Sequence, residues 1–65
     1  MLGTVKWFNA KKGFGFITGE DRKDYFVHHS NILIEGYRNL PQGKQVEFST
    51  AISIKGESAI QVVPK

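Results

Sequence analysis

The chain has 65 residues, a net charge of +3 from nine Lys and Arg against six Asp and Glu, and no cysteine. This length fits one domain over residues 1–65, with a free energy of unfolding of about 3–5 kcal/mol. The lack of cysteine excludes a disulfide and a thiolate metal site, and no apolar stretch reaches the ~18 residues of a membrane span. We see no signal peptide and expect a cytoplasmic protein that does not engage a membrane.

Short runs rich in Val, Thr, Trp and Phe, separated by Gly-containing turns, predict five strands. We expect them at residues 3–9, 14–18, 25–28, 45–54 and 58–63. One short helical turn, capped by Ser30, is expected at residues 30–33, and residues 34–43 form a long connection. No segment keeps the 3.6-residue apolar period over the ~10 residues that a helix needs.

Five strands in so short a chain leave open edges unless the sheet closes on itself. The sequence therefore predicts an all-β fold, a small antiparallel barrel. Four glycines would let its strands bend: Gly3, Gly13, Gly15 and Gly19. The predicted inward-facing residues are Val5, Ile17, Tyr25, Val27, Ile32, Val46, Phe48, Ile60 and Val62.

Residues 12–17, Lys-Gly-Phe-Gly-Phe-Ile, are the most informative stretch. On a strand, Phe14 and Phe16 lie on one face and Ile17 on the other. Ile17 suits the core, so the two rings face outwards. Bases stack on such rings for about 1–3 kcal/mol each, with little regard to base identity.

Neighbouring strands extend this predicted ring face. Phe26 and His28 share one face of the third strand, and simple alternation places Lys6 and Phe8 outwards on the first strand, with Trp7 inwards. If these strands are antiparallel neighbours, rings lie in the middle and lysines at the edge. Lysines there would follow phosphates, which predicts a single-stranded nucleic acid as the partner.

Two other interpretations compete with this one. The rings could belong to a second small core under the long connection, since most single aromatic residues in small domains are core. The residues available to cover them are Ile34, Tyr37 and Leu40. Covering both faces of three strands needs more apolar mass than the chain supplies. The alternative function is a protein-interaction module that uses the same face.

The sequence gives little support for an enzyme, a metal or a cofactor. His28, His29 and Asp24 are close in sequence, but adjacent histidines on a strand point to opposite faces and no third ligand has a suitable spacing. No Ser/His/acid set and no phosphate-binding Gly-rich loop is present. We therefore expect no catalytic residues and no cofactor.

Residues 12–17 resemble the RNP1 signature of RNA-binding sheets. RNA-recognition motifs carry it too, but they contain two helices, for which this chain has no room. The rest resembles the cold-shock domain: residues 3–9 its first strand, residues 24–28 its RNP2 strand, with matches continuing at residues 29–32, 35–37 and 42–43. This resemblance extends over nearly the whole chain.

The resemblance implies a five-stranded OB-type barrel that binds single-stranded RNA and single-stranded DNA, chiefly by stacking. Bacterial members are free-standing RNA chaperones, often induced by cold. We accordingly expect a monomer that prefers pyrimidine-rich strands and regulates transcription and translation.

The resemblance also implies which residues bind. Six stack on bases: Trp7, Phe14, Phe16, Phe26, His28 and Tyr37. Three make backbone or base contacts: Lys6, Asn9 and Lys12. Asp24 would contact a base edge or, alternatively, cap its hairpin loop, and Arg38 would reach phosphate or remain solvated. Trp7 reaches the binding face only if a bulge interrupts the alternation of its strand.

Two positions depart from the family pattern. His29 stands where the family usually has an aromatic residue, so we expect it to stack with less area. Near the last turn, Ser58 replaces a base-reading Gln, and Glu57 adds a repulsive charge. We expect weaker binding at that end of the strand.

Overall fold

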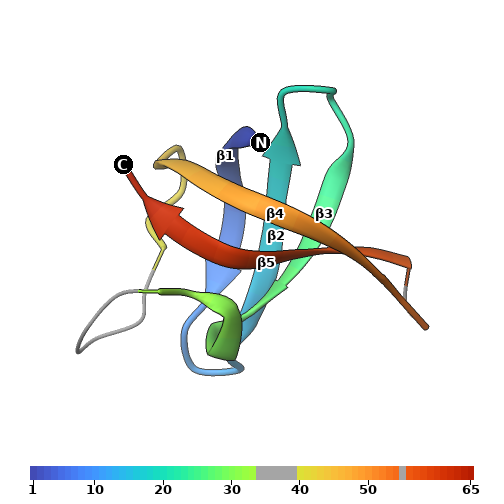
Figure 1. Ribbon diagram of the computed structural model, residues 1–65. Coiled ribbons are helices and arrows are strands. Elements are labelled where there is room, and N and C mark those ends of the chain that lie inside the picture. The colour runs from blue at the N-terminus through green and yellow to red at the C-terminus, as the bar shows by residue number, and fades with distance from the viewer. Residues whose placement is uncertain (34–39, 55) are drawn as a thin grey trace.

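The structure is a computed structural model that describes residues 1–33, 40–54 and 56–65 (Figure 1). Its strands are β1 (Leu2–Asn9), β2 (Phe14–Gly19), β3 (Asp24–His28), β4 (Gln45–Ser53) and β5 (Gly56–Pro64), and a 3₁₀ turn, η1, covers His29–Asn31. Each lies within a few residues of its predicted position. Within the described ranges, no helix has the length and apolar character needed to cross a membrane.

The strands close into a barrel in the order β1-β2-β3-β5-β4. β4 and β5 cross the direction of β1, β2 and β3 (Figure 1). This confirms the predicted all-β, five-stranded barrel. One seam differs from the antiparallel prediction, because β3 and β5 pair in parallel through Phe26 with Ser58 and Val27 with Ala59. The other four pairings are antiparallel.

The buried core lies inside the barrel and contains eight of the nine residues predicted to face inwards. Ile60 is the exception: it is only partly buried, and Ala59 takes the inward position. Between the pairs Glu47–Val63 and Ser49–Ile60, β5 uses one more residue than β4. This bulge, where Gln61 has a φ of 51°, shifts the inward face from Ile60 to Ala59.

Leu40 also belongs to this core and is 1% exposed. The interpretation that placed it over the outer rings therefore loses one of its three covering residues. The other two, Ile34 and Tyr37, lie outside the described residues.

A buried phenol closes one end of the core. The hydroxyl of Tyr25 donates a hydrogen bond to Asp21 Oδ2 at 2.5 Å. That bond, reinforced by burial and by the negative charges of Asp21 and Glu57, raises the pKa of Tyr25 to about 12. The same bond lowers the pKa of the Asp21 carboxyl. β3 is thereby tied to the loop that precedes it.

The η1 turn begins differently from the prediction. His28, not Ser30, is its N-cap, and the His28 side chain accepts a hydrogen bond from the Ser30 backbone N–H. A histidine ring nitrogen can serve here because the N-cap needs only an acceptor aimed at the first free N–H groups. The cap thus fixes the His28 ring at the end of β3.

Candidate nucleic-acid interface

Four aromatic rings form one cluster on the outer face of β1, β2 and β3. Phe16 pairs in register with Trp7 on one side and with Phe26 on the other, and Phe14 pairs with His28. The Trp7 ring centroid lies 5.8 Å from that of Phe14 and 5.4 Å from that of Phe16. The Phe26 centroid lies 5.8 Å from Phe14 and 5.9 Å from Phe16. We call these four residues the ring cluster.

The ring cluster remains open to solvent. Trp7 is 39% exposed, and Phe14, Phe16 and Phe26 are partly exposed. The rings contact one another mostly edge-on or tilted, with only Phe14 and Phe26 close to parallel. Such contacts leave parts of the flat faces available, and about 0.5–1.5 kcal/mol per pair holds the rings in place.

A bulge in β1 brings Trp7 into the cluster. Val5 pairs with Ile17, yet Trp7 pairs with Phe16, so Lys6 is an extra residue in β1. The extra residue reverses the alternation beyond it. The prediction from simple alternation was wrong for Trp7 and Phe8: Trp7 faces outwards, as the family resemblance implied, and Phe8 is partly buried and packs against the core.

Gly15 makes room for this arrangement. A Cβ at Gly15 would lie 2.6 Å from Phe8 Cα and 2.9 Å from Phe8 Cδ1, and still closer to the Trp7 carbonyl oxygen. Any side chain would therefore push β1 away from β2 at the bulge. Glycine between the two phenylalanines of β2 is thus what lets Phe8 pack inwards while Trp7 stays outside.

A polar network borders the ring cluster along the next step of β2. Lys6 Nζ donates a hydrogen bond to Asp24 Oδ2 at 2.7 Å, and Thr18 Oγ1 donates one to Asp24 Oδ1 at 3.1 Å. The bond from Lys6, followed by that from Thr18, lowers the pKa of Asp24. Both charged side chains remain about half exposed. The network holds a cation and an anion beside the rings without removing either from solvent.

The two histidines lie together at the opposite end of the face. The centroids of His28 and His29 are 4.3 Å apart. The prediction that they point to opposite faces was wrong, because the chain leaves β3 and enters η1 between them. His28 Nδ1 accepts from the Ser30 N–H at 3.3 Å, which places the proton of the neutral ring on Nε2. Within the described residues, no cluster of three His, Cys, Asp or Glu could hold a metal ion.

The turn between β1 and β2 uses one predicted binding residue as a structural element. Asn9 Oδ1 accepts a hydrogen bond from the Lys12 backbone N–H at 2.9 Å, and the Asn9 carbonyl accepts one from Gly13 at 2.7 Å. Gly13 has a φ of 80°, and a Cβ there would lie 2.6 Å from the ring of His29. The turn thereby holds Gly13 against the ring of His29 and leaves Lys12 exposed.

The remaining predicted site residues are spread over other places. Ser58, which is partly buried, lies beside Phe26 at the parallel seam, so it borders the ring cluster. Glu57 precedes it and is exposed. Tyr37 and Arg38 lie outside the described residues. Sequence reasoning missed Thr18, although its alternation with Phe14 and Phe16 was enough to place it on this face.

The comparisons with known proteins agree with this geometry. The sequence profile described as "'Cold-shock' DNA-binding domain" matches residues 1–65. The chain belongs to the cold-shock domain family. It is 54% identical over 63 residues to "Cold shock protein 1" of Lactiplantibacillus plantarum, covering 97% of this chain and 96% of that protein. It is equally identical over 63 residues to "Cold shock-like protein CspC" of Bacillus cereus, covering 97% of both.

A solved structure shares the fold of this cold-shock domain. The structure titled "drosophila Unr CSD456" superposes with a TM-score of 0.80 at 25% sequence identity. The match covers 98% of this chain but only 26% of that one. The cold-shock domain described here is accordingly a nucleic-acid-binding domain of the OB type.

Proposed function

We propose that this cold-shock domain binds single-stranded RNA and DNA, with little sequence selectivity, by stacking bases on the ring cluster. The observation that carries the proposal is the set of four contacting rings left partly exposed on three adjacent strands. Exposing these rings to water gives up the free energy that their burial would contribute to a small domain. A ligand with flat apolar faces accounts for them.

The surrounding charges suit the backbone of such a ligand. Lys6 lies beside the ring cluster in its bond to Asp24, and Lys12 lies in the turn that precedes Phe14; both are exposed. Stacking contributes about 1–3 kcal/mol per base, and each phosphate neutralised adds a salt-dependent increment through counterion release. Stacking requires an unpaired strand, because a duplex hides the faces of its bases, whereas the contacts to phosphate do not distinguish the two.

The biological role follows from this preference for unpaired strands. A protein that binds open strands and not duplexes shifts hairpins towards the open state by mass action, without ATP. We propose that it acts in the cytoplasm as a monomeric RNA chaperone of the cold-shock response. It would keep pyrimidine-rich messages accessible to transcription and translation when low temperature stabilises hairpins.

Fluorescence tests the proposal directly, because Trp7 is the only tryptophan in the chain. Adding oligo-uridine should quench it, and the double substitution Phe14→Ala and Phe16→Ala should remove most of the affinity. Val63→Ala is a matched control, since Val63 is 40% exposed on β5 and lies outside the ring cluster. A double variant that binds within twofold of the parent would contradict stacking. A flat titration of the parent would favour a protein partner for this face.

A further inference from the structure

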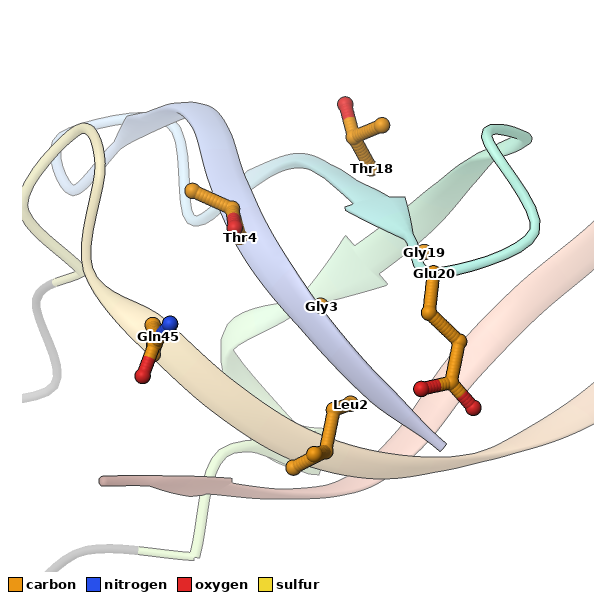
Figure 2. Close-up of a pocket in the computed structure, with 7 residues that line it drawn as sticks. All are labelled: Leu2, Gly3, Thr4, Thr18, Gly19, Glu20 and Gln45. Atoms are coloured by element: carbon orange, nitrogen blue, oxygen red, sulfur yellow. The ribbon is translucent and has the colours of Figure 1, made fainter.

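A pocket of about 270 Å³ lies on the outer surface where β1 passes between β2 and β4 (Figure 2). Figure 2 shows Leu2 and Gln45 on one side of β1 and Thr18 and Glu20 on the other. Thr4 and two glycines, Gly3 and Gly19, complete the wall. The volume is just below the range of about 300–1,000 Å³ that small-molecule sites occupy. It suits a single flat ring system with room for its edge groups.

The pocket continues the ring cluster. Phe16 and Thr18 lie on the same face of β2, two residues and roughly 7 Å apart. Thr4 pairs in register with both Thr18 and Gln45, so the walls of the pocket follow directly from the strand pairing. The Lys6–Asp24 pair, held by Thr18, stands at the boundary between the rings and the pocket. A strand stacked on Phe16 and continuing along β2 reaches the pocket with its next unit.

The polar groups of the pocket select against phosphate. Of the residues that line it, Glu20 carries the only charge, and none is Lys or Arg. A phosphate would meet a carboxylate of like sign. Within the described part of the chain, no hydrogen bond is formed by the side chains of Thr4, Glu20 or Gln45. A carboxylate, an amide and a hydroxyl are therefore all available to a neutral ligand that carries N–H donors and a carbonyl.

Among the bases, guanine matches this set best. Its Watson–Crick edge presents two adjacent N–H donors, which a carboxylate accepts with both oxygens, and its O6 accepts from an amide or hydroxyl. Uracil offers a single N–H between two carbonyls. One oxygen of the Glu20 carboxylate could accept from that N–H, but the other would be repelled by a uracil carbonyl. Cytosine and adenine each place an acceptor nitrogen beside their amino group. In a single strand this edge is free to be recognised.

We infer that the pocket is a guanine-selective subsite at the end of the ring cluster, with Glu20 as the residue that determines the selectivity. This inference rests on the proposed binding of single strands. It turns a sequence-tolerant stacking surface into one that favours a guanine at one end of the bound segment. A bidentate contact of this kind discriminates between bases by about fivefold or more.

The experiment compares heptamers with the intact protein at one salt concentration. U7 is the reference, and G, A or C is placed at the 5′ or the 3′ end of U6. We expect guanine at one of the two ends to tighten binding about fivefold, with adenine and cytosine within twofold of U7. Glu20→Gln should abolish the gain from guanine while leaving the affinity for U7 within twofold, because that carboxylate contacts the end base only.

Glu47→Gln is the matched control, since it removes the same charge from β4 at a residue outside the pocket, where Glu47 pairs with Lys65 at the surface. It should keep the full gain from guanine. No gain at either end, or a gain that survives Glu20→Gln, would overturn the inference while U7 binding still supports the proposed function. Failure of U7 itself to bind would overturn both.

Discussion

Truncation of two phenylalanines should affect binding by this domain very differently, although both changes lower its stability. Phe16 is partly exposed in the ring cluster, whereas Phe48 is 2% exposed in the core, where its ring centroid lies 5.3 Å from that of Tyr25. Phe16→Ala removes two ring contacts, with Trp7 and Phe26, worth about 0.5–1.5 kcal/mol each. We therefore expect it to lower the free energy of unfolding by about 1–3 kcal/mol.

The effect on binding should exceed what that loss of stability implies. Deleting one stacking platform costs about 1–3 kcal/mol of binding, which weakens the affinity for oligo-uridine by about 5- to 150-fold. Phe48→Leu keeps the core apolar and leaves a small cavity, so it should cost about 1–2 kcal/mol of stability. Its affinity should stay within twofold of the parent, because Phe48 faces away from the ligand.

Urea denaturation and a fluorescence titration on the same samples measure both quantities. Measurement at low temperature keeps each variant folded despite the small total stability. The reasoning would be refuted if Phe16→Ala bound as well as Phe48→Leu at equal folded fraction. It would equally fail if the affinity of both variants simply followed their stability.

Three further changes test other parts of the account. The pKa of Tyr25 is raised to about 12, against about 10 in an unfolded chain, so its contribution to stability is complete below pH 10 and is lost as the pH rises through 12. Tyrosinate absorbance should show ionisation of Tyr25 near pH 12, and Asp21→Asn should lower the pH at which Tyr25 is half ionised. Gly15→Ala should cost about 1–3 kcal/mol of unfolding free energy, because the new Cβ clashes with Phe8. Gly43→Ala should cost less, because Gly43 has a φ of 85° but open surroundings. Equal losses in urea denaturation would contradict the close approach of β1 to β2. Glu57→Gln should tighten oligonucleotide binding at low salt by up to about fivefold, and the gain should vanish at high salt. An unchanged affinity at low salt would show that the Glu57 charge does not face the bound nucleic acid.

Sequence reasoning succeeded where side-chain alternation and turn residues decide the outcome. The alternation of Phe14 and Phe16 against Ile17 is strict, and Gly13 and Gly43 mark turns. The core positions on β2 and β3 and the exposed rings on those strands followed from this pattern alone. The all-β barrel followed from the need to remove sheet edges in a short chain.

Two of the errors arose where a strand departs from a period of two. An extra residue at Lys6 reverses the faces of Trp7 and Phe8, and another in β5 exchanges Ile60 for Ala59. Bulges depend on how two strands fit together, so a single strand's sequence does not reveal them.

The site also contains groups that only the folded chain brings together. Asp24 meets Lys6 and Thr18 across three strands. The pocket joins Glu20 to Gln45, which are 25 positions apart in the printed sequence. Neither arrangement is marked by a short motif in the sequence. The family resemblance supplied the role of Trp7, but no sequence pattern pointed to Glu20 or Gln45.

NMR mapping of the bound strand tests the central claim most directly. On adding U6 to the labelled protein at low salt, we expect the largest chemical-shift changes at the ring protons of Trp7, Phe14, Phe16 and Phe26, with upfield shifts of uridine base protons from ring currents. Core methyl groups such as those of Val46 should barely move. Changes concentrated instead on the exposed Ile52 and Ile54 at the end of the β4–β5 hairpin, with the ring protons unmoved, would contradict stacking on the ring cluster.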